Sequence, residues 1–324
     1  MSFSELKKYR REVYIITDEN VADLWLGEIS DNLNVCRKGV FVLRTGDSNK
    51  NFENLEKILY TMFSKGFSRE MTVIALGGGA VMDIAGFAAS IYKHGIRELI
   101  FIPTTLLACV DAAFGGKNGI NLKEGKNLVG TFREADKVII NEKFLATLSE
   151  REIKSGMAEV LKYGLIRDKR LLEKDICVAD MISMSVDNKR YFVNADFEDK
   201  GNRKILNFGH TFAHAIEKMY AYKYISHGEA VGFGMILACT IGEKLGITEP
   251  ELANKVSEML LERGLPAYIE FKPDKLIEAI KADKKSTGDG VELILLREIG
   301  LPEIVEVDYI KLEKTLWEVH GEIT

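Results

Sequence analysis

The sequence predicts an α/β N-terminal domain built on a parallel sheet, followed by a mainly α-helical C-terminal domain. At 324 residues, the chain is longer than a single hydrophobic core usually supports. Short β-rich runs alternate with helical patterns as far as Leu148, and amphipathic helical patterns then continue almost to the end. We therefore expect two domains, over residues 1–148 and residues 149–324.

The strands expected in the N-terminal domain are continuous apolar runs. Such runs are typical of strands that are buried on both faces, in a parallel sheet covered by helices on each side. The runs are VYIIT (13–17), VFVLR (40–44), TVIAL (72–76), LIFIPTT (99–105) and KVIIN (137–141). Helical patterns separate them over residues 18–29, 51–66 and 80–95. This alternation predicts an architecture of the nucleotide-binding type.

The C-terminal domain is expected to be a set of packed helices. Apolar residues recur at helical spacing over residues 150–168, 205–220, 228–246, 250–264 and 273–283. The exception is DGVELILLREIG, over residues 289–300, which predicts a late strand or hairpin.

Charge and composition exclude several classes of function. The formal net charge of −5 argues against a nucleic-acid-binding surface, which needs concentrated positive charge. The N-terminus lacks the apolar stretch of a signal peptide, and no later segment is long enough to span a bilayer, so we expect a cytoplasmic protein without a membrane partner. The four cysteines lie far apart without CxxC spacing, which suits neither a structural zinc cluster nor a disulfide framework.

A glycine-rich turn follows the third expected strand, in TVIALGGGAVMDIAG. Gly78 and Gly79 would let the backbone approach a pyrophosphate, whose charge would meet free N–H groups of a helix that begins near Ala80. Asp83, in the first turns of that helix, could hold a cofactor hydroxyl. The turn is neither a GxGxxG fingerprint nor a Walker loop, and it is equally compatible with a tight βα connection.

A long polar segment follows the strand LIFI, over residues 103–132. We expect it to be structureless, and such a segment is more often functional than idle. Lysines in it could meet phosphate or carboxylate, and hydroxyls and amides could orient a ribose or a sugar. Its candidate residues are Thr104, Thr105, Asp111, Lys117, Asn118, Lys126 and Asn127.

Three of the five histidines fall within one short span. His210 and His214 are four residues apart, on one face of an expected helix, and His227 lies just beyond it. Glu159, on a helix rich in small residues, adds a carboxylate. Three protein ligands and one open position are typical of catalytic zinc. The spacing does not decide whether His214 binds metal or substrate.

Basic residues recur near these candidate ligands in the sequence. A divalent metal beside several cations indicates a strongly anionic ligand, because the positive charges otherwise repel one another. We therefore expect a substrate that carries phosphate, carboxylate or both. The basic residues are Lys162, Lys189, Arg203, Lys284 and Lys285.

These segments together resemble the 3-dehydroquinate synthase family of sugar phosphate cyclases, in family order and over most of residues 70 to 240. The matching strings are GGGAVMDIAGFAAS, IPTTLLACVDAAFGGKNGIN, GKNLVGTF, FLATLSERE, SGMAEVLKYG, RKILNFGHTFAHAIE and HGEAVGFGM. A weaker match, DKKSTGDGVELILLREIG, extends the resemblance towards the C-terminus.

The resemblance implies roles for individual residues. It implies Zn²⁺, with Co²⁺ as a substitute, held by Glu159, His210 and His227, whereas His214 would contact the substrate phosphate. It implies an NAD site lined by Asp18, Asp47, Lys50, Gly78, Gly79, Ala80, Asp83, Thr104, Thr105, Asp111, Lys117, Lys126, Asn127, Phe144, Thr147, Leu148 and Glu152. It implies substrate or catalytic contacts from Asp111, Lys117, Lys126, Asn127, Lys162, Lys189, Arg203, Asn207, His214 and one of Lys284 or Lys285.

The reaction implied by the resemblance is the cyclisation of 3-deoxy-D-arabino-heptulosonate 7-phosphate to 3-dehydroquinate in the shikimate pathway. It proceeds by transient oxidation with NAD, phosphate elimination, return of the hydride and an aldol closure. The family commonly has glutamate where this chain has Asp47, and arginine where it has His94. Because position 94 is expected to reach a neighbouring subunit, the resemblance implies a homodimer.

Three alternatives remain open at the level of sequence. Another sugar phosphate cyclase, making an inosose or a valiolone, would act on a substrate without a carboxylate and would not need Arg203 and Asn207. A metal-dependent polyol dehydrogenase would release NADH and would not need so many lysines. A module that binds NAD without catalysis would not need the complete ligand set.

Overall fold

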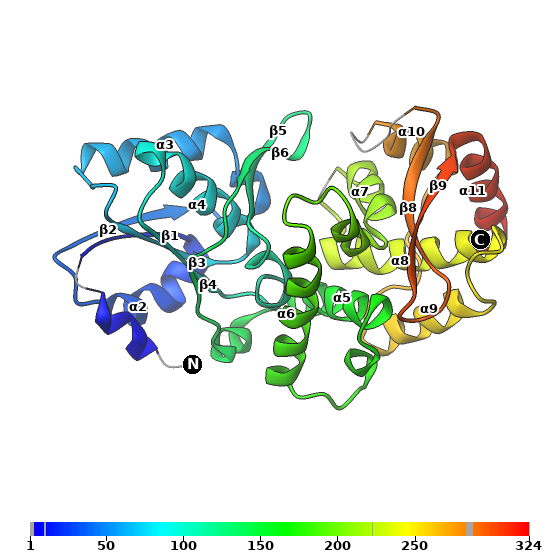
Figure 1. Cartoon of the computed structure of the whole chain (residues 1–324), viewed down its shortest axis with the longest axis horizontal. Helices are drawn as coiled ribbons and strands as arrows, with labels where there is room; N and C mark the ends of the chain where they lie inside the picture. Colours follow the sequence, from blue (N-terminus) through cyan, green and yellow to red (C-terminus); the bar gives the residue numbers. More distant parts are fainter. Residues whose placement is uncertain (1–2, 10, 222, 283–287, 324) are drawn as a thin grey trace. The chain divides into compact units, whose positions relative to one another are not determined.

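The chain forms two compact units, Met1–Leu148 and Ser149–Thr324. The computed structural model describes residues 3–9, 11–221, 223–282 and 288–323 (Figure 1). The candidate residues Lys284 and Lys285 lie outside the described residues.

The first unit is built on a five-stranded sheet in the order β2-β1-β3-β4-β7. All neighbouring strands are parallel, as the alternating pattern predicts. The carboxyl ends of β1, β3 and β4 therefore meet at one edge of the sheet. The strands are β1 (Glu12–Asp18), β2 (Arg37–Leu43), β3 (Thr72–Gly77), β4 (Glu98–Pro103) and β7 (Lys137–Val138).

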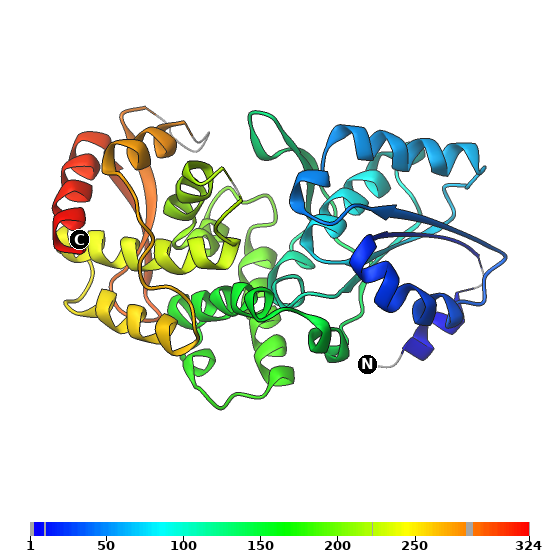
Figure 2. The ribbon, with the colours of Figure 1, turned by 180° about the vertical axis from the view of Figure 1, so that it is seen from behind.

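Alternate residues of the strands enter two separate cores, one on each face of the sheet. On β1, Tyr14 and Ile16 join one core while Val13 and Ile15 join the other. The first core includes residues of α3 (Phe52–Ser64) and α4 (Gly79–Ile91). The second receives Phe3, Ile29 of α2 (Gly27–Asp31) and Phe144. The views from the front and from behind show these helices on opposite sides of the sheet (Figures 1 and 2).

The remaining helical segments of the first unit are short. Asp18 caps α1 (Glu19–Val21), which continues through a π-helical turn, Ala22–Leu26, into α2. The other short segments, of 3₁₀ or π type, are Phe3–Lys8, Asp47–Asn49, Tyr92–His94, Ala108–Ala112 and Glu142–Thr147.

The expectation that the polar segment 103–132 is structureless is wrong. It contains a π-helical turn and an antiparallel hairpin of β5 (Lys117–Leu122) and β6 (Gly125–Phe132). The glycines allow the strands to approach closely, since a Cβ on Gly130 would lie 1.9 Å from the backbone oxygen of Asn118. The polar side chains of this segment are thus held on a defined backbone.

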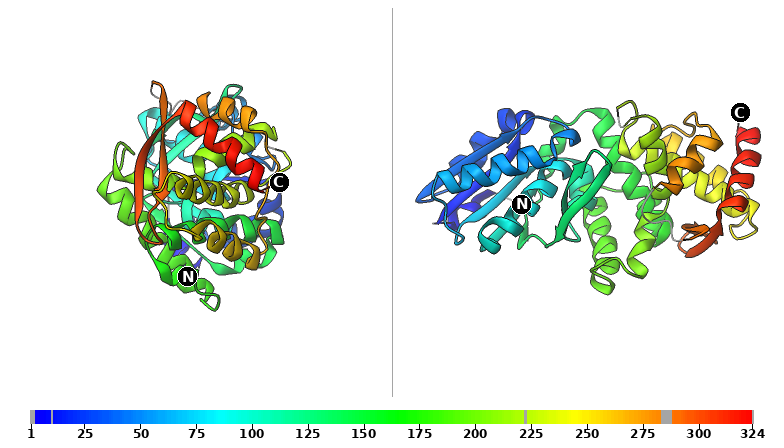
Figure 3. Two further views of the ribbon diagram at one scale, coloured as in Figure 1. Left: turned by 90° about the vertical axis from the view of Figure 1, so that its right-hand side faces the viewer. Right: turned by 90° about the horizontal axis from the view of Figure 1, so that it is seen from above.

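The second unit is mainly helical. Among its elements, α7 packs against α8 and α10, and α8 also packs against α5 and α9. The predicted late hairpin is present as β8 (Gly290–Leu296) paired antiparallel with β9 (Pro302–Asp308), and Figure 3 shows it at the side of the helices. The helices are α5 (Glu150–Ile166), α6 (Val178–Ala195), α7 (His210–Met219), α8 (His227–Lys244), α9 (Leu252–Glu262), α10 (Pro273–Lys281) and α11 (Tyr309–Ile323), with 3₁₀ turns at Lys169–Leu172 and Asn202–Asn207.

Two further structural facts bear on the sequence-based expectations. Within the described part of the chain, no helix is both long and apolar enough to cross a membrane. The cysteines are free; Cys109 and Cys239 are buried, and Cys36 and Cys177 are exposed.

Candidate active site

The glycine-rich turn lies at the carboxyl edge of the parallel sheet. Gly78 caps α4 and Gly79 is the first residue of that helix. A Cβ on Gly78 would lie 3.1 Å from the Thr105 side chain, and one on Gly79 would lie 3.2 Å from Ala112. The turn therefore packs closely against the segment after β4, where larger residues would force the two apart.

Other candidates line the same edge. The Asp18 carboxylate accepts a hydrogen bond from the Val21 N–H at 3.1 Å, and the Thr104 N–H donates to the Gly77 oxygen at 2.9 Å. The Thr104 hydroxyl is buried without a hydrogen-bond partner among the described residues. Ala80 and Asp83 are on the first turns of α4, and Asp111 is on the π-helical turn after β4.

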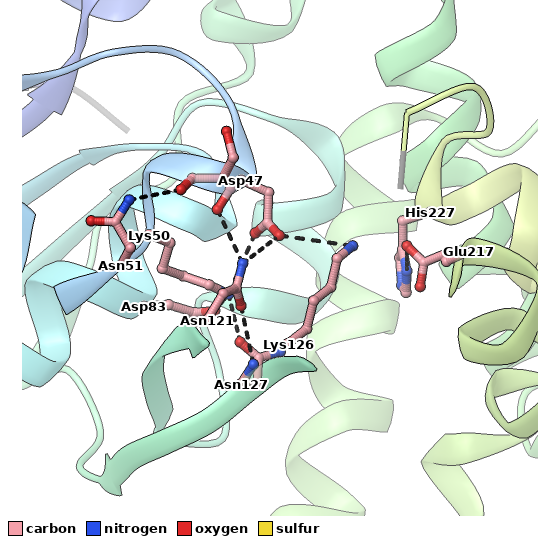
Figure 4. A network of polar contacts seen from close by, with 10 residues as sticks. Asp47, Lys50, Asn51, Asp83, Asn121, Lys126, Asn127, Glu217 and His227 are labelled. Carbon is pink, nitrogen blue, oxygen red and sulfur yellow. Dashed lines mark hydrogen bonds and ion pairs between the residues drawn. The ribbon is translucent and has the colours of Figure 1, made fainter. Parts of the chain in front are cut away.

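A buried lysine connects this edge to the β5–β6 hairpin (Figure 4). The Lys50 ammonium is 2.7 Å from an Asp83 oxygen, 2.5 Å from the Asn127 amide oxygen and 3.5 Å from Asp47. Asp47 in turn accepts a hydrogen bond from Asn121 at 2.8 Å and lies 3.7 Å from the Lys126 ammonium. Five candidates that are scattered in the sequence therefore form one network.

The charges of this network stabilise one another. Although burial by itself lowers the pKa of Lys50, Asp83 and Asp47 raise it above its ordinary value. Burial tends to raise the pKa of Asp47, but Lys50 and Lys126 outweigh it and hold the pKa below its ordinary value. For Asp83, burial outweighs Lys50 and raises the pKa.

The other candidate cofactor residues lie at the start of β5, in the 3₁₀ turn Glu142–Thr147 and its C-cap, and in the first turn of α5. Lys117 is exposed at the start of β5, away from the β5–β6 turn. The Phe144 ring is buried between Phe3 and Trp25, with centroid distances of 5.5 and 5.0 Å, so this side chain is a core residue. The Thr147 hydroxyl donates to the Phe144 oxygen, and Leu148 follows it as the C-cap of that turn. In the second unit, Glu152 completes the capping box of α5.

Glu159, His210 and His227 come together in the second unit. One ligand atom from each lies within 4.8 Å of the others. The Glu159 Oε1 atom is 3.4 Å from the Nε2 atom of both histidines, while its Oε2 atom contacts the Lys162 ammonium. A fully buried carboxylate with one oxygen facing two imidazole nitrogens fits a divalent metal site of the zinc type.

Local structure places these side chains. Glu159 is in the middle of α5, and each histidine is the first residue of its helix. His210 follows Gly209, whose φ of +79° is in the left-handed region and starts α7 in its observed direction. His227 precedes Gly228, where a Cβ would lie 2.3 Å from the Ser155 backbone. Gly228 therefore permits the start of α8 to pack directly on α5.

The remote ring nitrogens of both histidines have partners of their own. His210 Nδ1 is 3.2 Å from the Phe208 carbonyl oxygen, which assigns the proton to Nδ1. His227 Nδ1 is 3.6 Å from a carboxylate oxygen of Glu217. Both arrangements leave Nε2 available as a ligand atom.

The cluster shifts the pKa values of its members. Burial and the nearby Lys162 lower the pKa of His210 to about 4. Burial also tends to lower the pKa of His227, but its contacts with Glu159 and Glu217 raise it to about 10. Burial alone would raise the pKa of Glu159, whereas Lys162 and His210 hold it well below its usual range.

Several candidate substrate residues lie in the same unit. The buried Lys162 ammonium contacts Glu159 Oε2, and the His214 ring is perpendicular to that of His210 at a centroid distance of 5.7 Å. Arg203 is buried and donates to the Phe197 oxygen at 2.6 Å. Lys189 is buried on α6, and Asn207 ends the 3₁₀ turn that precedes α7.

Sequence reasoning misses two polar residues of these clusters. Asn121 does not stand out from the rest of the polar segment, although its amide connects Asp47 to the Asn127 backbone. Glu217 follows His210 by seven residues and His214 by three, and this spacing is the signal that could have placed all three on one helix face.

Solved structures with this architecture define the class of protein. A 2-epi-5-epi-valiolone synthase from Streptomyces hygroscopicus subsp. jinggangensis, with NAD⁺ and Zn²⁺ bound, matches with a TM-score of 0.87 at 26% identity, over 96% of this chain and 91% of that one. A 2-deoxy-scyllo-inosose synthase matches with a TM-score of 0.85 at 24% identity, over 96% of this chain and 91% of that one. A glycerol dehydrogenase from Schizosaccharomyces pombe shares the fold less closely, with a TM-score of 0.64 at 16% identity over 98% and 86% of the two chains. The architecture is that of the sugar phosphate cyclases.

Sequence comparisons identify the family within this class. The family model for the 3-dehydroquinate synthase N-terminal region matches residues 40–155, and that for the C-terminal region matches residues 156–286. The chain belongs to the 3-dehydroquinate synthase family. It is 42% identical to a 3-dehydroquinate synthase of Dictyoglomus thermophilum, over 93% of this chain and 88% of that protein. It is 40% identical to one of Campylobacter concisus, over 91% and 88% of the two chains.

Proposed function

We propose that this protein is a 3-dehydroquinate synthase, a lyase that cyclises 3-deoxy-D-arabino-heptulosonate 7-phosphate to 3-dehydroquinate and releases phosphate. The observation that carries the proposal is the buried Glu159 carboxylate, which faces two imidazole nitrogens in a chain about 40% identical to proteins of that name. Its place is the shikimate pathway.

The proposed cofactors are NAD and a divalent metal, preferably Zn²⁺. A metal at this site supplies a Lewis acid, and NAD supplies a hydride acceptor that is regenerated in each turnover. Glu159, His210 and His227 would hold the metal. The related structures contain NAD⁺ with Zn²⁺ in one case and with Co²⁺ in the other, which supports this pairing.

The polar side chains near these sites have different proposed roles, which follow from their contacts. The Lys162 ammonium contacts Glu159 Oε2 and leaves Oε1 facing the two histidines. The Lys50 network would fix Asp83 and Asn127 beside the glycine-rich turn, where cofactor hydroxyls and phosphates are expected.

The remaining contacts suit an anionic substrate. Arg203 and Asn207 suit the substrate carboxylate, and His214, Lys189 and Lys162 suit its phosphate and hydroxyls. A carboxylate-binding arginine favours 3-deoxy-D-arabino-heptulosonate 7-phosphate over a hexose phosphate, which has no carboxylate. We also propose that the protein is a cytoplasmic homodimer, as the family resemblance implies.

The decisive test follows phosphate and NADH together. The purified protein is loaded with Zn²⁺ and incubated with 3-deoxy-D-arabino-heptulosonate 7-phosphate in large excess over NAD. We expect phosphate release to exceed the NAD present many times over, without a steady rise in NADH absorbance. NADH that accumulates with substrate consumption, with little phosphate released, would instead assign the protein to the polyol dehydrogenases.

A further inference from the structure

Glu217 lies beside His227, the histidine that begins the neighbouring helix. Its Oε1 atom is 3.6 Å from His227 Nδ1, and its side chain is 4% exposed. Figure 4 shows the carboxylate and the imidazole side by side. Glu217 comes from α7 and His227 from α8, two helices that pack against each other. Burying a carboxylate is costly unless it is compensated, so this placement indicates a specific partner.

One face of α7 carries several of the polar groups of the cluster. His210, His214 and Glu217 are at positions i, i+4 and i+7, which share a helix face. His210 is one candidate metal ligand, and Glu217 reaches the other histidine ligand from two turns further along. The helix therefore contributes one ligand directly and contacts a second through its remote nitrogen.

The two histidine ligands have different partners. His210 Nδ1 is hydrogen-bonded to a neutral backbone carbonyl, that of Phe208, whereas His227 Nδ1 faces a carboxylate. A carboxylate fixes the orientation and tautomer of an imidazole and makes its other nitrogen more basic. That other nitrogen, His227 Nε2, is the atom that faces Glu159 Oε1 at 3.4 Å.

We propose that Glu217 is a positioning residue for the metal site: it holds His227 with the proton on Nδ1 and presents Nε2 to the metal. This inference rests on the metal site of the proposed function. With a metal bound, Glu217, His227 and the ion would form a carboxylate–histidine–metal triad in which Glu217 is not itself a ligand. Its contribution is to tighten metal binding and to set the electron density that His227 donates.

The test uses the full-length protein with Zn²⁺ in competition with a chromophoric chelator, and with Co²⁺ as a spectroscopic probe. We expect Glu217→Gln to weaken Zn²⁺ binding by about 10- to 100-fold, the usual effect of losing such a partner. We also expect it to change the visible absorption of the Co²⁺ form. Glu217→Asp, which keeps the charge but shortens the side chain, should recover part of the affinity.

Glu243→Gln is the matched control. Glu243 accepts a hydrogen bond from the Ala253 N–H at 2.8 Å and belongs to the last turn of α8, whereas His227 begins that helix, roughly 24 Å away along its axis. Its replacement removes a similar charge but should leave Zn²⁺ affinity and the Co²⁺ spectrum unchanged. Zn²⁺ affinity within about twofold of the native value in folded Glu217→Gln would overturn the proposal, since the expected loss is at least tenfold.

A second measurement does not depend on the folding of a variant. In native, Zn²⁺-loaded protein with ¹⁵N-labelled histidine, His227 should carry its proton on Nδ1 and be metal-bound through Nε2. A proton on Nε2 would overturn the role of Glu217. Failure of the native protein to bind Zn²⁺, or undiminished binding by His210→Ala, would count against the metal site itself and is thus distinguishable from failure of this inference.

Discussion

Lys162 and Glu159 form an ion pair, one turn apart in α5, that engages only one oxygen of the carboxylate. The ammonium contacts Oε2, while Oε1 faces His210 and His227. The side chains of the pair are 2% and 1% exposed. Lys162 therefore compensates the buried charge of Glu159. It also occupies Oε2, so that Oε1 is the oxygen available to a metal ligated by the two histidines.

Replacing Lys162 should make the stability of the helical unit depend on metal. In Lys162→Met, the buried Glu159 charge loses its partner, and we expect the metal-free protein to lose about 3–5 kcal/mol of unfolding free energy. Zn²⁺ should restore much of this loss because it supplies a new positive partner. Urea unfolding with and without Zn²⁺ measures both effects.

Lys275→Met is the control for this prediction. It breaks the Lys275–Glu278 pair, which spans three residues as Glu159 and Lys162 do but is exposed on both sides. Because solvent screens an exposed pair, the urea midpoint should barely change, with or without metal. An equal loss in Lys162→Met under both conditions would show that Zn²⁺ does not compensate Glu159.

Removing a candidate ligand should abolish metal binding and turnover together. We expect Glu159→Ala and His210→Ala, like chelation of the native protein, to eliminate phosphate release, since a lost ligand cripples metal affinity. The residues proposed for NAD binding lie mainly in Met1–Leu148, so circular dichroism and NAD titration should show that this unit stays folded. Full activity in metal-stripped protein would refute the assignment.

The contact between Gly228 and Ser155 should be essential for the metal site. In Gly228→Ala, the added methyl group would clash with the Ser155 backbone and displace the start of α8 together with His227. We expect a loss of about 1–3 kcal/mol in stability and weaker Zn²⁺ binding. Gly27→Ala is the control because nothing lies within 4 Å of its added Cβ, and it should be neutral or slightly stabilising. Native Zn²⁺ affinity in Gly228→Ala would contradict the positioning argument.

Arg203→Lys should weaken substrate binding more than NAD binding. A lysine cannot reproduce a planar, two-point contact with a carboxylate. The expected loss is about 1.5–3 kcal/mol, or roughly 10- to 150-fold in affinity for the sugar phosphate. Separate titrations with substrate and NAD measure this difference. An equal loss for both ligands would indicate that Arg203 has a structural role, through its contact with Phe197.

Asp47→Asn should give a pH-dependent change in stability. The pKa of Asp47 is held below its ordinary value by Lys50 and Lys126, against the opposing effect of burial. Its stabilising contribution is therefore present above its unfolded pKa, about 3.9, and is lost as the pH falls through the lower folded value. The difference in urea midpoint between native protein and variant should be clear at neutral pH and shrink below about pH 4. A constant difference over this range would exclude the ionic explanation.

The sequence predicts the main elements because their apolar patterns reflect burial directly. The runs that form β1, β3 and β4 are buried on both faces, and this is what continuous apolar strands indicate. The hairpin of β5 and β6 escapes prediction because its polar residues and glycines are typical of loops. Its pairing depends on contacts such as Gly119 with Gly130, which local patterns do not reveal.

The candidate site likewise contains residues that the sequence indicates and residues that only the folded structure brings together. Three histidines in one span and a family resemblance are enough to indicate His210 and His227 from the sequence. The role of Glu217 depends on the packing of α7 against α8, and that of Asn121 depends on the return of the β5–β6 hairpin to Asp47. The resemblance also implies a cofactor contact for Phe144; its side chain is packed between Phe3 and Trp25, and the cofactor contact stays a prediction.

The three candidate ligands come from three different helices, α5, α7 and α8. A bound ion would therefore act as a cross-link that ties distant parts of the chain together, much as a disulfide does, and would stabilise only the packed arrangement. Losing the ion would then allow the helices to separate more often and expose them to proteases. Metal supply would set the lifetime of the polypeptide as well as its activity.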